Sequence, residues 1–231
     1  MVWAMPVSAV LFDLDETLFN RSASLRDFVA DQFSTKWHCD HIDFNAVVDR
    51  FLELDARGRL HKMEVYGTLL AELGLADSDV AKEMFFDYET RAWRFARAFD
   101  GAAELLSWLT REGVRFGIVS NGQTHIQLRS ILALNLDRLT DVYLISEQEK
   151  CRKPDPEIFR RAADRLGIST GQCVFVGDSP EADMFGARSV GMKTVWFPNG
   201  AAWPTSYLWQ PDATVSSLFE AREVIANWIT N

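Results

Sequence analysis

The chain has 231 residues, of which 48% are hydrophobic and 25% are charged, and its formal net charge is −9. This composition is that of a globular protein with a sizeable core, and no apolar run approaches the ~20 residues that a membrane-spanning helix needs. The acidic balance disfavours nucleic acid, whose phosphates are bound by clustered Lys and Arg, so we expect neither a nucleic-acid nor a membrane partner.

The N-terminal segment and the cysteines both bear on the compartment. Residues 1–6 lack a basic stretch followed by a long apolar one, so we expect a cytoplasmic protein. The three cysteines, Cys39, Cys151 and Cys173, are widely spaced and form no C-x-x-C pair. We therefore expect free thiols rather than a disulfide framework or a zinc site. The sequence is compatible with a monomer or a homodimer.

The first predicted strand, residues 7–13, runs directly into two acids. Asp13 and Asp15 are two positions apart, and residues at that spacing in an extended segment face the same side. Two neighbouring carboxylates raise the proton affinity of one of them unless a cation or hydrogen-bond donors compensate. The sequence therefore indicates a functional site at the end of this strand.

The next stretch, residues 22–99, has apolar residues at helical spacing and no convincing strand. Turn signals divide this stretch into about four helices. We predict a helical cap domain over residues 20–97. It would be inserted into an α/β catalytic core formed by residues 1–19 and 98–231.

Predicted helices and strands alternate from residue 100 onward. The helices are expected at 102–111, 123–134, 156–166, 181–190 and 218–229. The strands are expected at 114–120, 141–146, 172–177, 193–197 and 213–215. Such alternation implies a parallel sheet that is covered by helices on both faces. We therefore predict an α/β fold whose core is a doubly wound, Rossmann-like parallel sheet.

Residues suited to chemistry gather at the predicted strand ends. Asp13, Ser120 and Asp178 stand at or directly after strands, and Lys153 follows another strand at a short distance. In doubly wound sheets the ligand crevice lies outside the carboxyl ends of the strands. We expect these four side chains to meet there.

Four short motifs surround these residues. The first is Asp13-Leu14-Asp15-Glu16-Thr17-Leu18, which has the pattern D-x-D-x-T-L. The others are Ser120-Asn121-Gly122, Lys153-Pro154-Asp155-Pro156 and Gly177-Asp178-Ser179-Pro180-Glu181-Ala182-Asp183. Together, in this order, they resemble the motifs of the aspartate-nucleophile phosphohydrolases of the haloacid dehalogenase superfamily. The resemblance covers roughly residues 7 to 200.

The resemblance implies a role for each acid and a Mg²⁺ cofactor. Asp13 would be the nucleophile that forms an aspartyl-phosphate, and Asp15 would be the general acid and base. Asp13 and Asp178 would give the metal its carboxylate ligands, together with the backbone carbonyl of Asp15. For Asp183 the resemblance leaves open a contact with the metal, direct or through water, and a supporting role in orienting Lys153 or the metal ligands.

The substrate side of the site follows from the same resemblance. Ser120 and Asn121, at a helix start, suit an anionic phosphoryl group, and Lys153 would neutralise charge on that group and on the nucleophile. Arg21, shortly after the first motif, is expected to meet the substrate, with a surface ion pair as the alternative. The cap would choose the substrate by closing over the crevice. Most of its aromatic rings are expected to form its own core: Trp37, Phe44, Phe51, Tyr66, Phe85, Phe86, Tyr88, Trp93 and Phe95.

The predicted function is a Mg²⁺-dependent phosphatase of a small phosphorylated metabolite, such as a nucleotide, phosphoglycolate, a sugar phosphate or flavin mononucleotide. The nearest alternative is a phosphomutase of the same superfamily, which tends to carry a cap His that residues 20–36 lack. A 2-haloacid dehalogenase is disfavoured by Asp15, because that branch usually has a non-acidic residue there. A non-catalytic binding protein would not need a nucleophile and an acid together.

Overall fold

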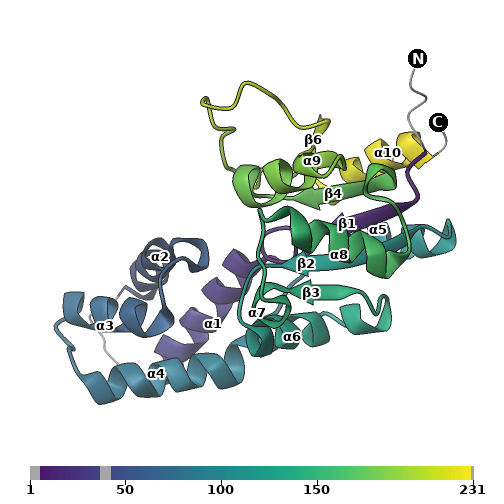
Figure 1. The fold of residues 1–231 in the computed structure, drawn as a ribbon. Coiled ribbons are helices and arrows are strands. Elements are labelled where there is room, and N and C mark those ends of the chain that lie inside the picture. The colour runs from purple at the N-terminus through teal and green to yellow at the C-terminus, as the bar shows by residue number, and fades with distance from the viewer. Residues whose placement is uncertain (1–5, 37–42, 230–231) are drawn as a thin grey trace. The chain divides into compact units, whose positions relative to one another are not determined.

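The computed structural model describes residues 6–36 and 43–229. The chain divides into two compact units (Figure 1). One unit comprises Met1–Phe19 and Ala98–Asn231, and the other comprises Asn20–Arg97. We call them the α/β unit and the helical unit.

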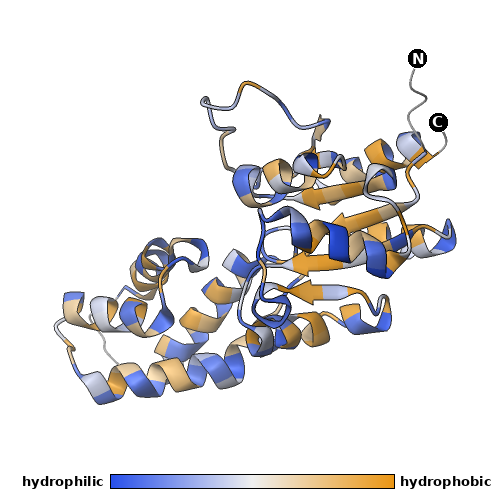
Figure 2. Cartoon of the chain, viewed as in Figure 1, coloured by the Kyte–Doolittle hydropathy of each residue, from blue (hydrophilic) through white to orange (hydrophobic). Residues whose placement is uncertain are grey.

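Within the described residues, the α/β unit is built on a six-stranded sheet whose neighbouring strands are all parallel. Listed from one edge to the other, the strands are β3 (Tyr143–Ile145), β2 (Arg115–Ser120), β1 (Ala9–Phe12), β4 (Cys173–Gly177), β5 (Lys193–Trp196) and β6 (Ala213–Thr214). The hydrophobic character of the central strands β2, β1 and β4 is plain in Figure 2, as expected for strands with both faces covered. The predicted doubly wound α/β fold is confirmed.

The first strand, β1, lies inside the sheet, and the strand order reverses beside it. Phe12 on β1 is level with Ile118 on β2 and with Val176 on β4. The chain adds β2 and β3 on one side of β1 and then returns to place β4 on the other side. The carboxyl ends of β1 and β4 therefore flank a topological switch point, which is where such sheets bind ligands.

Amphipathic helices cover this sheet, and α8 (Pro156–Leu166) illustrates why. The side chain of Asp155 caps its first turn, and Gly167 ends it in a left-handed conformation. The apolar side of α8 packs on the sheet face that carries Ala9 and Leu11. The other helices described in this unit are α5 (Ala102–Arg111), α6 (Thr124–Ala133), α7 (Ser146–Glu149), α9 (Gly186–Ser189) and α10 (Leu218–Ile229), with 3₁₀ turns at η3 (Leu136–Arg138) and η4 (Thr170–Gln172).

One predicted helix, at 181–190, is wrong in type over its first part. The structure has a π-helix, η5 (Pro180–Phe185), before the short α9. The amide of Met184 donates to the carbonyl of Ser179 at 3.1 Å, which is the five-residue spacing of a π-turn. Asp183 explains the wider turn, because its carboxylate folds back to accept from the backbone N–H of Ser179 at 2.9 Å.

Two further expectations can be examined in the fold. Cys151 and Cys173 are free thiols, and burial raises the pKa of Cys173 to about 11. Cys39 and Trp37 lie outside the described residues. In the described part of the chain, no helix combines the length and the apolar composition that crossing a bilayer requires.

The helical unit is a set of helices around a core of its own. Its described elements are α1 (Arg21–Lys36), α2 (Phe44–Asp55), η1 (Ala56–Gly58), α3 (Lys62–Glu72), α4 (Ser78–Arg91) and η2 (Ala92–Phe95). Phe51 and Tyr66 are fully buried in this core, and most of the other described aromatic rings pack against it. Phe86 and Trp93 differ, because their side chains are exposed.

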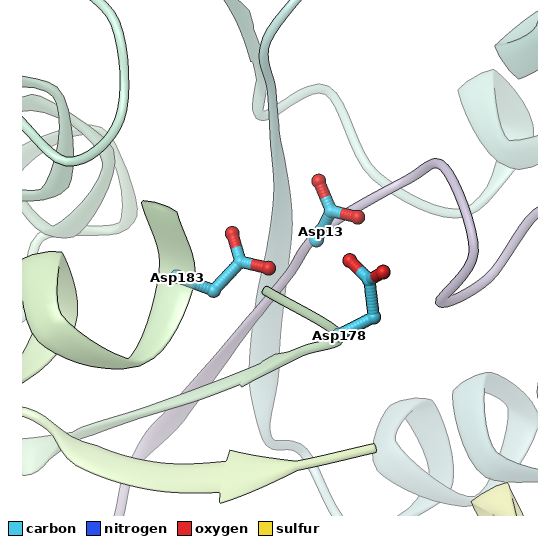
Figure 3. Close-up of side chains that lie close together, drawn as sticks. All are labelled: Asp13, Asp178 and Asp183. Atoms are coloured by element: carbon cyan, nitrogen blue, oxygen red, sulfur yellow. The ribbon is translucent and has the colours of Figure 1, made fainter. Parts of the chain in front are cut away.

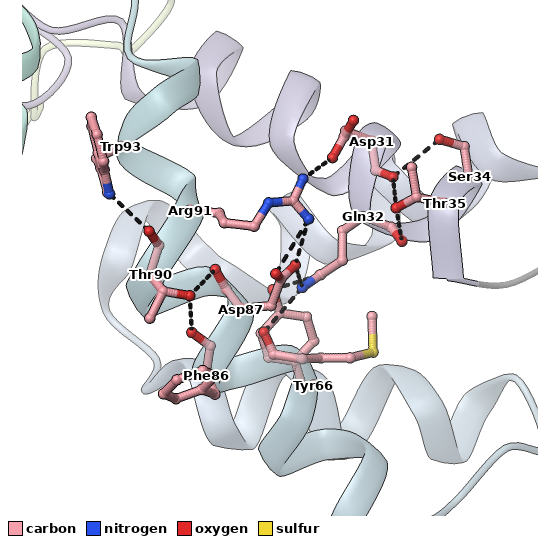
Figure 4. Close-up of polar contacts among 11 residues, drawn as sticks. Asp31, Gln32, Ser34, Thr35, Tyr66, Phe86, Asp87, Thr90, Arg91 and Trp93 are labelled. Carbon is pink, nitrogen blue, oxygen red and sulfur yellow. Dashed lines mark hydrogen bonds and ion pairs between the residues drawn. The ribbon is translucent and has the colours of Figure 1, made fainter.

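A buried polar network crosses this apolar core (Figure 4). The amide nitrogen of Gln32 on α1 donates to Asp87 on α4 at 3.0 Å, and the hydroxyl of Tyr66 on α3 donates to the amide oxygen of Gln32 at 2.8 Å. Arg91 donates to both oxygens of Asp87 at 3.2 Å and forms an ion pair with Asp31. The network joins α1, α3 and α4 through hydrogen bonds inside the helical unit.

Replacing Tyr66 by Phe should destabilise the protein by about 1–2 kcal/mol, because the buried amide oxygen of Gln32 loses its donor. The midpoint of urea unfolding measures this change. A free energy of unfolding equal to that of the wild type would show that the network contributes nothing to stability.

Candidate active site

Asp13 lies at the carboxyl end of β1, where the sheet holds it in place. Its backbone N–H donates to the carbonyl of Val176 on β4 at 2.9 Å. Its side chain is buried, with 6% of its surface exposed, and its Oδ1 lies 2.5 Å from Nζ of Lys153. The first predicted acid and the predicted lysine therefore meet directly, although they are 140 residues apart in sequence.

Two more carboxylates complete this cluster (Figure 3). Asp178 directly follows β4, and its backbone carbonyl accepts a hydrogen bond from the indole nitrogen of Trp196 at 2.8 Å. Carboxylate oxygens of Asp13, Asp178 and Asp183 all lie within 4.8 Å of one another. Acids from two segments, the end of β1 and the residues that follow β4, thus converge at the switch point between β1 and β4.

Asp183 contacts both Lys153 and the backbone of Ser179, and its Oδ1 is buried without a hydrogen-bond partner among the described residues. One oxygen forms an ion pair with Nζ of Lys153 at 2.7 Å, and the other accepts from the N–H of Ser179 at 2.9 Å. A Cβ atom at Gly177 would stand 2.4 Å from this carboxylate, so the glycine makes room for it. The sequence left the role of Asp183 open, and the geometry favours the orientation of Lys153.

Burial and charge act against one another in this cluster. Burial raises the pKa of Asp13 well above its ordinary value; Lys153 opposes the rise, and Asp183 and Asp178 add to it. Burial disfavours the charge on Lys153, but Asp13 and Asp183 outweigh burial and raise the pKa of its ammonium group. Lys153 is therefore held as a cation, and a further positive charge beside Asp13 would lower the pKa of its carboxyl group.

The cluster suits a divalent cation. Three carboxylates gather around one ammonium group, so the acids of the cluster outnumber this cation when all of them are ionised. Carboxylate oxygens are the hard ligands that Mg²⁺ prefers, and a bound cation would remove the penalty on ionising Asp13. The three acids are placed to share a cation, and the assignment of Asp13 and Asp178 as its ligands stays a prediction.

Two buried hydroxyls accompany the acids. Ser120 ends β2, and its Oγ, like that of Thr17 in the first motif, is buried without a hydrogen-bond partner among the described residues. Buried polar groups are usually paired, so the unpaired hydroxyl of Ser120 is available to bind a ligand. Ser120 was predicted to bind substrate, whereas Thr17 was not singled out.

Asn121 connects two of the loops. Its side-chain nitrogen donates to the carbonyl of Lys153 at 2.9 Å, and its side-chain oxygen accepts from the N–H of Lys153 at 2.9 Å. This reciprocal pair fixes the backbone from which the Lys153 side chain projects. The predicted contact of Asn121 with substrate stays a prediction.

Asp15 stands apart from the acid cluster and has a partner that sequence reasoning missed. Its Oδ2 accepts a hydrogen bond from Nε2 of Gln127 on α6 at 2.9 Å. Gln127 lies outside the four motifs, within the helix that was expected at 123–134. No signal in the sequence singled it out.

Arg21 lies in the helical unit and is paired there. Its guanidinium group donates to both oxygens of Asp55, at 2.6 and 3.1 Å, and Lys62 contacts the same buried carboxylate. Burial alone would raise the pKa of Asp55, but the bonds and charges of Arg21 and Lys62 lower it. The ion pair that was the alternative for Arg21 is thus present, in a buried form, and its contact with substrate stays a prediction.

These features define a class of protein. A parallel α/β sheet with clustered aspartates and a lysine beyond its strand ends, in a chain that carries a helical unit inserted after the first strand, is typical of hydrolases that use an aspartate as nucleophile. Residues 7–191 match the family of haloacid dehalogenase-like hydrolases. The chain belongs to this family of enzymes.

Two relatives and one solved structure illustrate the similarity. A glyceraldehyde 3-phosphate phosphatase from Pyrococcus furiosus is 30% identical over 226 residues, which are 95% of this chain and 93% of the relative. An N-acylneuraminate-9-phosphatase from Mus musculus is 27% identical over 93% of this chain and 92% of its own length. The magnesium-bound HAD-hydrolase YfnB from Bacillus subtilis shares the fold, with a TM-score of 0.72 at 22% identity, over 96% of this chain and 99% of that one.

Proposed function

We propose that this chain is a Mg²⁺-dependent phosphatase of small phosphomonoesters that works through an aspartyl-phosphate on Asp13. The observation that carries the proposal is the position of Asp13: a buried carboxylate at a strand end, 2.5 Å from Lys153 and within 4.8 Å of two further acids. The relatives named above are phosphatases of small phosphorylated metabolites, which supports the same reaction type here.

In the first half of the proposed reaction, the Asp13 carboxylate attacks phosphorus and the bond to the leaving oxygen breaks. Asp15 gives its proton to that oxygen, so the product leaves as an alcohol. In the second half, Asp15 takes a proton from water as the water attacks the aspartyl-phosphate, which releases phosphate and restores Asp13. Lys153 balances negative charge on the nucleophile and the phosphoryl group in both halves, and Ser120 offers its unpaired hydroxyl to the phosphoryl oxygens.

Asp13 and Asp178 would hold Mg²⁺, with the backbone carbonyl of Asp15 as the ligand that the family resemblance adds. When bound, the ion would supply positive charge to a site that otherwise has an excess of carboxylates. Asp183 would keep the ammonium group of Lys153 in place beside Asp13. Each charged side chain of the cluster thus has a proposed role: nucleophile, metal ligand, charge balance or positioning.

Substrate choice is proposed to lie in the helical unit, as a cap over residues 20–97 attached to a core of 1–19 and 98–231. The ends of this unit connect to the α/β unit just after the first motif and again before α5, which is where a cap would be attached. Arg21 would contribute to substrate binding from this unit. A cytoplasmic location and a monomeric or homodimeric state stay predictions.

The chain should release phosphate from an aryl phosphate in the presence of Mg²⁺, and excess EDTA should abolish this activity. Restoring Mg²⁺ should recover the activity, because the ion is the one cofactor that the proposed reaction uses and carboxylates bind it directly. Turnover that is unchanged after metal removal would refute the proposal. Chloride release from a 2-chloro acid, or isomerisation of a hexose phosphate without phosphate release, would instead identify a dehalogenase or a mutase.

A further inference from the structure

We infer that Gln127 is a positioning residue for Asp15: its amide nitrogen occupies Oδ2 and thereby leaves Oδ1 as the oxygen that transfers the proton. The inference rests on the proposed phosphatase function, in which Asp15 is the acid and base. It concerns a residue outside the four motifs and a contact that lies wholly within the α/β unit.

The contact is well defined. Gln127 projects from α6, and only 4% of its surface is exposed. Its Nε2 lies 2.9 Å from Oδ2 of Asp15 and 3.3 Å from the backbone carbonyl of Asn121. One nitrogen with two hydrogen atoms thus connects the acid of the first motif to the loop of the second.

The carbonyl of Asn121 fixes which end of the amide faces Asp15. A backbone carbonyl only accepts, so the end of the Gln127 side chain that points at it must be the nitrogen. The same nitrogen reaches Asp15, and Gln127 is therefore a donor to that carboxyl group in both of its protonation states. In a protonated carboxyl the carbonyl oxygen is the stronger acceptor, so an N–H bound to Oδ2 favours the proton on Oδ1.

Two features support a specific role for the amide nitrogen of Gln127 as a hydrogen-bond donor to Asp15. The amide oxygen, Oε1, is buried and has no hydrogen-bond partner among the described residues, an arrangement that is unfavourable for folding. Gly122 makes room for the amide, because a Cβ atom there would stand 2.5 Å from Nε2 of Gln127. A side chain retained only for packing would not need a polar group in this position.

The consequence is a defined proton path. When the bond between phosphorus and the leaving oxygen breaks, its electron pair stays on that oxygen, which takes the proton from Oδ1 of Asp15. When water attacks the aspartyl-phosphate, its proton returns to Oδ1 and the bond between phosphorus and Asp13 breaks. Gln127 itself gains and loses no proton in either half.

The test compares two substrates in the Mg²⁺-loaded enzyme. An alkyl phosphate needs a proton on its leaving oxygen, whereas p-nitrophenyl phosphate has a leaving group that departs without one. Replacing Gln127 by Met should lower kcat/KM by about 10- to 100-fold for the alkyl phosphate and by less than about 3-fold for the aryl phosphate. The parameter kcat/KM reports the formation of the aspartyl-phosphate, and in that step only the alkyl leaving group needs the proton of Asp15. Equal losses for both substrates, or no loss, would overturn the inference.

A second variant and a control make the result independent of folding. Gly122→Ala should displace the Gln127 amide and produce the same selective loss. Ser130→Ala, on the same helix, removes only a long hydrogen bond to a helical carbonyl at 3.4 Å, and it should leave both rates unchanged. A wild-type enzyme that hydrolyses neither ester would refute the phosphatase itself, whereas an active wild type with an indifferent Gln127→Met variant would refute only the role of Gln127.

Discussion

Replacing Asp13 by Asn should lower kcat by at least about 10³-fold, because a carboxamide has no charged oxygen to attack phosphorus. The substitution keeps the size of the side chain, so substrate binding should persist. Steady-state phosphate release with Mg²⁺ measures the effect. Asp141→Asn, at an exposed position of the same unit, is the matched control and should retain full activity.

The same variant should be more stable than the wild type when metal is absent. The pKa of Asp13 is raised in the folded state, chiefly by burial, so its negative charge destabilises the fold at neutral pH. Protonated Asp13 makes its full favourable contribution to the free energy of unfolding in acid, and this contribution is lost as the pH rises through the folded-state pKa. The melting temperature in EDTA should therefore be higher for Asp13→Asn than for the wild type at neutral pH, and the difference should vanish in acid.

Mg²⁺ should reverse this order, because the ion stabilises the wild type more than a variant that lacks one carboxylate ligand. Melting curves at neutral pH with and without the ion measure the reversal. An Asp13→Asn variant that melts below the wild type in EDTA would contradict the charge balance described for the site.

Replacing Lys153 by Met should lower kcat by at least about 10³-fold and destabilise the protein by about 3–5 kcal/mol. The ammonium group lies 2.5 Å from Asp13 and 2.7 Å from Asp183, so its removal leaves both buried carboxylates without their common partner. Mg²⁺ should restore part of the stability but little of the activity.

The matched control for Lys153→Met is Lys82→Met. Lys82 forms an exposed pair with Asp79 at 2.9 Å on the helical unit, and such pairs contribute little. Phosphate release and urea unfolding should both stay near wild-type values in this control. Substantial activity in Lys153→Met would exclude the lysine from the reaction.

Local sequence patterns predict most of this fold. Helices α5, α8 and α10 begin and end at the residues expected from their apolar spacing, because capping residues and glycines act over one turn. The strands are shorter by one or more residues than expected, since only the paired part counts as strand. The π-helix could not be predicted, because it depends on how Asp183 bonds to the backbone of Ser179.

In the candidate site, too, the residues marked by local motifs were predicted, whereas contacts that depend on the fold were not. Asp13, Ser120 and Asp178 were found because each stands at or directly after a strand within a motif, and Lys153 was found from its own motif. Their meeting, and the contact of Lys153 with Asp13, followed from the strand ends and the family resemblance. The sequence did not decide among the roles open to Asp183, because its ion pair with Lys153 depends on the fold.

Partners outside the motifs were missed altogether. Gln127 reaches Asp15 from 112 residues away, and Asp55 reaches Arg21 from 34 residues away. A single Gln or Asp within a helix carries no mark of such a contact. Only the packing of whole elements brings these pairs together.

The central claim is that Asp13 accepts the phosphoryl group, and acid quenching of the working enzyme tests it most directly. After brief mixing with an aryl phosphate and Mg²⁺, peptide mapping by mass spectrometry should find one phosphoryl group, and should find it on Asp13. The phosphoryl group should be absent from the Asp13→Asn variant treated in the same way. A phosphoryl group on another side chain during turnover would contradict this account.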